Sequence, residues 1–147
     1  MSHHLTTEKA EAILLEPGLI ENIVKPGVTI EVEDIWQLKE KNTELSHGDK
    51  YAVLVTQGHL SNVSQEAREL AASLEFAQQT LAKALHVESL GHRIVGDFYL
   101  KINKPHIKTR LFTDRSVALI WLRSILNEYR KQNHRWTTHA KYKAAIR

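Results

Sequence analysis

The chain has 147 residues, of which 42% are hydrophobic and 25% are charged, the composition of an ordinary globular domain. No apolar run approaches the roughly 18 residues that a membrane-spanning helix needs, so we expect no membrane span. The absence of cysteine excludes disulfides, thiolate metal sites and a cysteine nucleophile, and it favours a cytoplasmic protein.

The net charge of +3 is distributed unevenly along the chain. Residues 1–100 hold 8 Lys and Arg against 15 Asp and Glu, whereas residues 101–147 hold 12 against 2. A basic last third can attract phosphates, acidic proteins or anionic lipid, and it can equally be a solvated tail without a partner. The charge pattern alone leaves both interpretations open.

The first elements predicted along the chain are a β-hairpin and a helix. Two short apolar runs, 10–15 and 19–24, are separated by a Glu-Pro-Gly turn at 16–18, which is typical of a hairpin. After a Lys-Pro-Gly break, Thr29 is suited to cap a helix. The residues predicted on the buried face of this helix are Val32, Ile35, Leu38 and Leu45.

The middle of the chain alternates strands with helices. Residues 51–56 form a continuous apolar run bounded by polar turns, which predicts a central strand buried on both faces. Ser64 is suited to cap the helix that follows, and a less regular strand is predicted over 81–87. The remaining predicted elements are a helix over 88–102, a strand over 110–112 and a final helix capped by Thr113 or Asp114.

Apolar residues recur at helical spacing in each of the last three helices, so we expect most of them in the core. In the final helix they cover most of the circumference, which indicates deep burial or use in association. They are Ala67, Leu70, Ala71, Leu74 and Ala77 in the first helix, Leu90, Ile94, Val95, Phe98, Tyr99 and Ile102 in the second, and Ala118, Leu119, Leu122, Ile125, Leu126 and Tyr129 in the third, with Val117, Ile120 and Trp121 beside them.

The order of these elements predicts an α/β fold, with a mixed, largely parallel β-sheet, an N-terminal β-hairpin and flanking helices. A chain of this length can bury the core of one such domain. We divide it into an N-terminal extension over 1–9, one α/β domain over 10–127 and a basic C-terminal extension over 128–147.

Several segments of the domain resemble one known family in their order and spacing. They are GVTIEVEDI, YAVLVT, SQEARELA, LKINKP, TRLFTD and ALIWL, which begin at Gly27, Tyr51, Ser64, Leu100, Thr109 and Ala118. The combination of LKINKP with TRLFTD is the most specific part of the pattern. Together these segments resemble the SpoIIAA-like small bacterial domains, which are STAS-like or SEC14-like.

The resemblance implies a fold and little chemistry. It implies a non-catalytic regulatory or protein-interaction module similar to the STAS-type anti-sigma-factor antagonists. In the regulatory members, a serine at the start of the helix after the central strand is phosphorylated within an Asp-Ser-Ser/Thr-Gly-like turn. Ser64 is at the matching position, although the acid and the glycine are missing here. Ser64 and Ser61 are therefore candidate phosphoacceptors, and the alternative role of Ser64 is that of a helix cap.

The sequence carries no recognisable catalytic or metal-binding motif. None of the nine histidines has the i, i+4 helical spacing with a neighbouring acid that zinc proteases use. A Gly-x-Ser-x-Gly elbow, a phosphate-binding glycine loop and a dinucleotide fingerprint are also missing. Only His59, Ser61 and Asp97 are weak catalytic candidates. We therefore expect a protein that is not an enzyme and has neither a metal site nor a cofactor.

Two groups of basic residues are candidate contact sites. The first follows the helix over 88–102 and suits an anionic ligand or a partner, while the second lies in the C-terminal extension beside aromatic residues that can stack on single-stranded nucleic acid. The first group is Lys101, Lys104, His106, Lys108 and Arg110, and the second is Arg130, Lys131, Arg135, Trp136, Lys141 and Lys143.

We expect a cytoplasmic bacterial module that docks a protein partner, and homodimerisation stays open. The first alternative, suggested by the SEC14 resemblance, is a binder of a hydrophobic or anionic small ligand in a cleft between the helix over 88–102 and the sheet. The second alternative is a nucleic-acid accessory protein that uses the basic tail. A closed apolar pocket favours the small ligand, a solid core favours docking, and an exposed basic aromatic tail favours nucleic acid.

Overall fold

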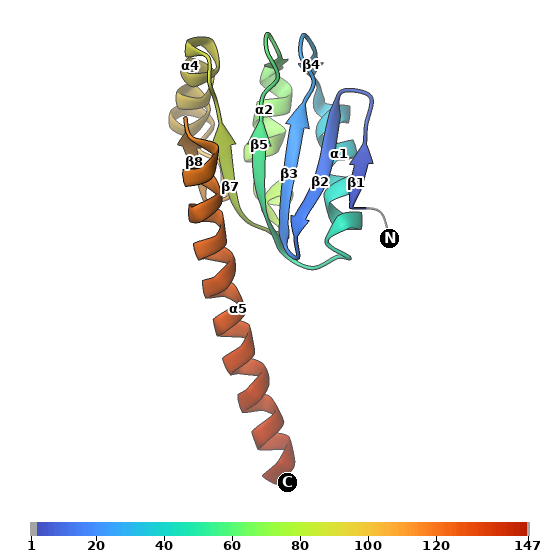
Figure 1. Cartoon of the computed structure of the whole chain (residues 1–147), viewed down its shortest axis with the longest axis vertical. Coiled ribbons are helices and arrows are strands. Elements are labelled where there is room, and N and C mark those ends of the chain that lie inside the picture. The colour runs from blue at the N-terminus through green and yellow to red at the C-terminus, as the bar shows by residue number, and fades with distance from the viewer. Residues whose placement is uncertain (1–2, 147) are drawn as a thin grey trace.

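The computed structural model describes residues 3–146, with side chains described for residues 3–133, and its centre is a six-stranded sheet. The strands are β1 (His4–Thr6), β2 (Ala10–Glu16), β3 (Leu19–Val24), β5 (Tyr51–Thr56), β7 (Thr80–His86) and β8 (Thr109–Phe112). They lie side by side in the order β1-β2-β3-β5-β7-β8 (Figure 1). β1, β2 and β3 pair antiparallel, and β3, β5, β7 and β8 pair parallel. The predicted α/β class with a mixed, largely parallel sheet is confirmed.

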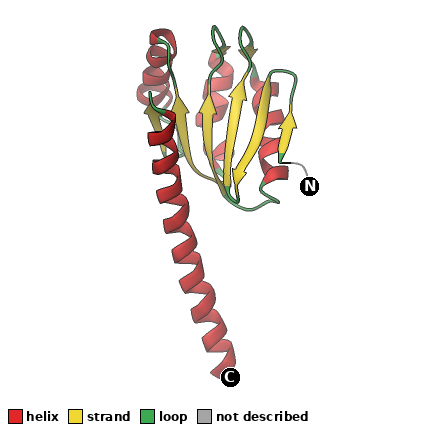
Figure 2. Ribbon diagram, viewed as in Figure 1, coloured by secondary structure: helices red, strands yellow, loops and turns green. Residues whose placement is uncertain are grey.

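Helices cover both faces of this sheet (Figure 2). The helices α1 (Val32–Leu45), α2 (Gln65–Ala72) and α4 (Leu90–Phe98) lie on one face, and α5 (Arg115–Ile146) lies on the other and extends past the end of the strands (Figure 1). Shorter elements are α3 (Leu74–Ala77), the π-helical turn η1 (Tyr99–Asn103) that continues α4, and a separate parallel pair of β4 (Thr29–Ile30) and β6 (Asn62–Val63).

The connections between strands explain why three helices share one face. β3, β5, β7 and β8 follow one another across the sheet in chain order. Connections between parallel strands are almost always right-handed, so each crossover in a sheet that grows in one direction places its helix on the same side. The crossover helices are α1, α2 and α4. The opposite face is left for α5, which follows the last strand.

The face beneath α5 is packed as the sequence predicts. Ala118, Leu122 and Leu126 of α5 are buried against the sheet, where the small side chains of Ala82 and Ala84 let the helix approach. Leu119 is buried as well, and the partly buried Ile125 and Trp121 pack at the margin of this cluster. Val117 and Ile120 are exposed, so the apolar circumference of α5 is only partly used within the chain.

The start of α1 differs from the sequence prediction. Thr29 and Ile30 form β4, which pairs with β6, instead of capping the helix. A two-residue strand is too short to show a periodic pattern, so it could not be predicted from the sequence. Glu31 is the cap, and its backbone N–H donates to the Asp34 carboxylate over 2.8 Å. Lys9 donates to the same carboxylate over 2.8 Å. This bond ties the helix start to the N-terminal part of the chain.

The structure also differs from the sequence prediction in where some helices and strands begin and end. Residues 4–6 form β1, which the sequence analysis does not predict. The helix after Ser64 breaks at Ser73, whose Oγ donates to the Leu70 carbonyl over 2.7 Å and accepts from the next turn, so that α3 starts afresh. As a result Leu74 is 65% exposed and not in the core. Val32, at the first turn of α1, is also exposed.

Candidate functional site

A cavity of about 150 Å³ lies between the sheet and the three crossover helices. Its floor is the face of β3, β5 and β7 that points away from α5, with Val53, Val55 and Leu85 in the middle. Side chains of α1, α2, α4 and η1 form the opposite wall. Those on the helices are mostly apolar and include Ile35, Leu38, Ala71, Val95 and Tyr99.

Two glycines allow backbone segments to approach closely around this cavity. A β-carbon at Gly96 of α4 would lie 2.7 Å from Cδ1 of Leu111, so the missing side chain lets α4 pack against β8. A β-carbon at Gly58 would lie 2.4 Å from the carbonyl oxygen of Val24. Gly58 therefore brings the loop after β5 against the end of β3, beside the cavity residues Gln57 and Ser61.

The cavity wall carries cationic side chains and, among the described residues that line it, no carboxylate. The three cations are Lys39, Arg68 and Lys83. Lys83 lies in the interior strand β7, is 9% exposed, and forms no hydrogen bond or ion pair with another described residue through its side chain. Its Nζ is 5.6 Å from the centroid of the Phe76 ring. Burial, and secondarily the charge of Lys39, lowers the pKa of Lys83 to about 8.

Lys39 is placed differently from Lys83. Its Nζ donates to the carbonyl oxygens of Phe76, over 3.1 Å, and Gln78, over 3.0 Å, and it lies 4.6 Å from the centroid of the Phe76 ring. Burial lowers the pKa of Lys39. Because two carbonyls already compensate the Lys39 ammonium, Lys83 is the amine in this cavity that is left for a ligand.

Polar groups with spare hydrogen-bonding capacity lie on the helical side. The guanidinium of Arg68 donates to the Val63 carbonyl over 2.6 Å, but its Nε is buried and has no hydrogen-bond partner within the described part of the chain. The hydroxyl of Tyr99 is also buried without a partner among the described residues, and burial raises the pKa of Tyr99. Nε2 of His92 lies 2.9 Å from the carbonyl oxygen of Ser61. A bound polar group can satisfy Nε of Arg68 and the hydroxyl of Tyr99 where the free chain does not.

A reciprocal amide pair lies on the β3 side of the cavity. Asn22 of β3 donates to Asn42 of α1 over 2.8 Å, and Asn42 donates back over 2.9 Å. Both residues are 5% exposed. The pair fixes α1 over the sheet, and its amide groups are already satisfied, so we do not assign it to ligand binding.

The two candidate phosphoacceptors have different surroundings. Ser64 caps α2, since its Oγ accepts from the backbone N–H of Ala67 over 3.2 Å, as the sequence predicts. Ser61 is 5% exposed, lines the cavity, and donates its hydroxyl proton to Gln57 over 2.9 Å. Ser61 is thus part of the cavity wall. Phosphorylation of either serine stays a prediction.

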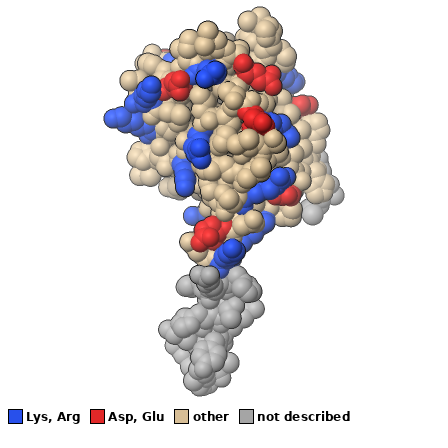
Figure 3. All heavy atoms as spheres, turned by 60° about the vertical axis from the view of Figure 1, so that its left-hand side comes forward, with Lys and Arg blue, Asp and Glu red and all other residues tan. Residues whose placement is uncertain are grey.

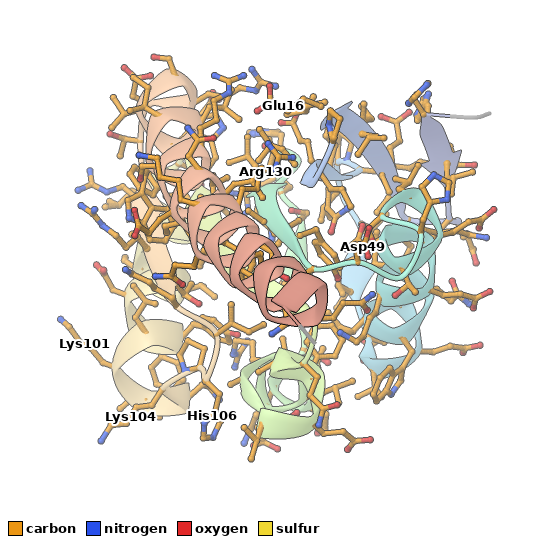
Figure 4. The ribbon with its side chains drawn as sticks, turned by 90° about the horizontal axis from the view of Figure 1, so that it is seen from below. Glu16, Asp49, Lys101, Lys104, His106 and Arg130 are labelled. Atoms are coloured by element: carbon orange, nitrogen blue, oxygen red, sulfur yellow. The ribbon has the colours of Figure 1, made fainter. Side chains whose placement is uncertain are left out.

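The first basic group does not line the cavity. All five of its members are exposed, and Lys101 and Lys104 point away from the body at the end of η1 (Figure 4). His106 lies on the loop that follows. On the side shown in Figure 3, Lys and Arg are spread over the surface and mixed with Asp and Glu. Arg110 lies 5.2 Å from the ring of Phe112, so it contributes to packing beside α5. The remaining member, Lys108, is exposed as well.

The second basic group is only partly described. Arg130 donates a hydrogen bond to the Pro17 carbonyl in the β2–β3 turn, and Lys131 is exposed. The other four predicted tail contacts lie outside the residues whose side chains the structure describes. These four are Arg135, Trp136, Lys141 and Lys143.

Four apolar residues that the sequence analysis places in the core are exposed instead. Leu90 is 71% exposed, Ile94 60%, Phe98 47% and Ile102 63%. They recur every four residues and form one row along α4 and η1, which we call the outer row. The buried side of the same helix carries Val95, Gly96 and Tyr99.

The remaining catalytic candidates and the possible metal ligands do not form a site within the described part of the chain. His59 and Asp97, two of the weak catalytic candidates, do not line the cavity. Within residues 3–133 we find no cluster of three or more His, Asp and Glu that could hold a metal ion. None of the described helices is both long enough and apolar enough to span a bilayer.

Comparison with known proteins places the fold. No curated protein matches the sequence significantly. The structure is similar to that of an uncharacterised protein of the DUF3478 family with a SpoIIAA-like fold, from Shewanella loihica PV-4. The two share 14% identity with a TM-score of 0.52, over 81% of this chain and 90% of that chain, a likeness that concerns the fold alone. A family model for a domain of unknown function, DUF7793, matches residues 13–126. The chain therefore belongs to the DUF7793 family, and its fold is the SpoIIAA-like fold that the sequence predicts.

Proposed function

We propose that this domain binds a small molecule with a largely apolar body and one negatively charged or hydrogen-bond-accepting end. The observation that carries the proposal is the cavity, with apolar walls, cationic side chains and no lining carboxylate among the described residues. A cavity of about 150 Å³ is the size that admits a single benzene-like ring in other proteins. A ring or a short chain of this size therefore suits the cavity.

The electrostatics favour a ligand with an acceptor group at Lys83. A buried ammonium without a partner is costly, and this cost is already present in the free protein. A carboxylate that enters the cavity gains the attraction of Lys83 without breaking an existing ion pair of that residue. Binding of such a ligand raises the pKa of Lys83, because the ligand stabilises the charged form.

Benzoate and benzyl alcohol form a matched pair of probes, since they share the ring and differ in the charge of the polar end. We expect isothermal titration calorimetry at neutral pH to show tighter binding of benzoate. Lys83→Met is expected to weaken benzoate binding about tenfold or more, and to change benzyl alcohol binding much less. Val55→Phe, which fills the cavity, is expected to remove the binding of both.

The control is Lys108→Met, which removes an exposed lysine that does not line the cavity. This variant is expected to bind benzoate like the wild type. Native mass spectrometry of protein purified from its own host reports any ligand that stays bound. The proposal is abandoned if ring compounds do not bind to the wild type and the protein from its host carries no small molecule.

The outer row supports a second candidate function, the docking of a protein partner. Four exposed apolar side chains at four-residue spacing are the pattern with which a helix enters an apolar groove. We expect a photo-crosslinker at Ile94 to capture one discrete protein in the host. The purified form of that protein is expected to bind the wild type but not the double variant with Ile94→Gln and Phe98→Gln. A second copy of this chain is one such partner, and sedimentation velocity detects it. Equal crosslinking from Val117, an exposed apolar control on α5, contradicts docking through the outer row.

A further inference from the structure

Lys83 has the placement of a reactive amine. It lies in the interior strand β7, where its backbone N–H donates to the Lys108 carbonyl over 2.9 Å and its register partner across the sheet is Val53. This backbone is fixed by strand pairing on both sides, since β7 lies between β5 and β8. The side chain opens into the cavity, and its described surroundings provide no acceptor for the ammonium. A rigid element therefore holds an uncompensated amine beside an apolar volume.

The surroundings of this amine favour its neutral, nucleophilic form. A lysine that is desolvated in an apolar pocket, near a second cation, is more often unprotonated than an exposed one. With a pKa of about 8, roughly a tenth of the Lys83 side chains are neutral at pH 7. The titratable or charged groups that line the same cavity are Lys39 on α1, Arg68 on α2, His92 on α4, Tyr99 on η1 and Tyr51 on β5.

We propose that Lys83 forms a reversible imine with a small aldehyde or ketone that enters the cavity. The inference rests on the proposed function and names the polar end of the ligand as a carbonyl group. The neutral Nζ adds to the carbonyl carbon to give a carbinolamine, which loses water to form the C=N bond. The carbonyl oxygen leaves in that water with the two protons of the amine. The step consumes no oxidant or reductant, and addition of water reverses it.

Benzaldehyde is the probe, because it has the ring of benzoate and carries an aldehyde carbon in place of the carboxylate. The full-length protein is incubated with benzaldehyde at a mildly alkaline pH, and borohydride is then added to reduce any imine to a stable benzylamine. Intact mass measures the number of benzyl groups for each chain, and peptide mapping locates them. We expect the benzyl group on Lys83, with an occupancy at least about tenfold above that of any exposed lysine.

Three variants distinguish modification of Lys83 in the cavity from modification of lysines on the surface. Lys83→Met is expected to lose the modification, and Lys41→Arg, which removes a lysine of α1 that does not line the cavity, is expected to keep it. Val55→Phe keeps Lys83 but fills the cavity, and is expected to lower the occupancy at Lys83. Excess benzoate is expected to compete with benzaldehyde. Circular dichroism confirms that each variant is folded.

The outcomes distinguish the inference from the function on which it rests. If benzoate binds in a Lys83-dependent manner but borohydride traps nothing at Lys83, the imine is wrong and the ligand cavity stands, with Lys83 acting only as an ion-pair partner. A label spread evenly over exposed lysines such as Lys101 and Lys108 also overturns the imine. If neither benzoate nor benzaldehyde binds and the protein from its host carries no small molecule, both the imine and the proposed function fall.

Discussion

The amine of Lys83 lies 5.6 Å from the centroid of the Phe76 ring, and no described carboxylate pairs with it. The electron-rich face of an aromatic ring attracts a cation, but by less than an ion pair does in the interior of a protein. The ring therefore compensates only part of the cost of burying the charge. The rest of that cost should be measurable as a dependence of stability on pH.

Lys83→Met is expected to stabilise the free protein near neutral pH. The pKa of Lys83 is about 8 in the folded chain and 10.5 for an unperturbed lysine, so the unfolded chain holds more protons between these two values. The wild-type free energy of unfolding therefore rises with pH across this window. We expect the variant to be more stable than the wild type by about 1–3 kcal/mol at pH 7, and the difference to shrink toward pH 10.

Urea denaturation of both proteins across this pH range measures the effect. Lys108→Met, which removes an exposed lysine, is the control and should show no comparable trend. A stability difference between Lys83→Met and the wild type that stays constant with pH contradicts the depressed pKa of Lys83.

The amide pair of Asn22 and Asn42 is expected to be strongly coupled. Each donates to the other, over 2.8 and 2.9 Å, in a buried position. Replacing either by leucine removes both reciprocal hydrogen bonds of the other buried amide, which should cost about 1–3 kcal/mol. The double variant should lose less than the sum of the single losses, since both unsatisfied groups are then removed. Chemical denaturation of the four proteins gives the coupling free energy, and simple additivity would falsify the coupling.

The ion pair of Glu21 and Arg115 is expected to contribute more to stability than an exposed pair. Glu21 is 5% exposed and accepts from the Arg115 guanidinium over 2.7 Å and from the Thr56 hydroxyl over 3.0 Å. Glu21→Gln should lower the free energy of unfolding by about 1–3 kcal/mol, because hydrogen bonds to a buried charge are lost.

Glu16→Gln is the matched control for Glu21→Gln. Glu16 pairs with Arg123 over 3.2 Å, and both side chains of this pair are substantially exposed. We expect its loss to change stability by about 0–1 kcal/mol. Equal effects of the two substitutions in thermal denaturation contradict the structural role given to Glu21.

Gly58→Ala is expected to destabilise the chain, whereas Gly91→Ala is not. The added β-carbon at Gly58 would overlap the backbone at Val24 and Lys25, which cannot move without disturbing β3. We expect a loss of about 1–3 kcal/mol from this strain. Gly91 lies in α4 with open space around the added carbon, so alanine there should stabilise the helix by up to about 1 kcal/mol. The two unfolding midpoints, measured side by side, test the difference.

The sequence predicts the sheet class and the packing of α5 well, because both depend on strong local signals. The continuous apolar run at 51–56 is recognisable as a buried strand, and the stripe with Ala118 and Leu122 has the helical period. The alternation of strands and helices then leaves few topologies. Both signals correspond to burial in the structure, because apolar residues of β5 and the stripe of α5 pack in one core cluster.

The orientation of α4 could not be predicted in the same way. Its buried side centres on Val95, Gly96 and Tyr99 and includes His92, whereas the longest apolar side chains lie on the outer row. Glycine and histidine contribute little to a hydrophobic period, so the period places the buried side too far toward Leu90 and Ile94. The close approach of α4 to Leu111 requires glycine at position 96. It results from tertiary packing and produces no periodic pattern in the sequence.

Lys83 escapes sequence-based prediction for a related reason. A lysine in a strand usually points toward solvent, and the sequence around Lys83 gives no other interpretation. Helices cover both faces of β7, however, so Lys83 faces the cavity and not open solvent. A lysine inside a strand that helices are expected to cover on both sides is the signal that could have identified it.

The separation of the cavity from the α5 face bears on how this family can diverge. Among the described residues, ten are buried in one cluster beneath α5, and none of these ten lines the cavity. Substitutions among the cavity residues of β5, β7, α2 and α4 therefore alter the shape and charge of the cavity while the cluster beneath α5 keeps its side chains. Selection can therefore change the lining of the cavity on one side of the sheet without rebuilding the packing on the other.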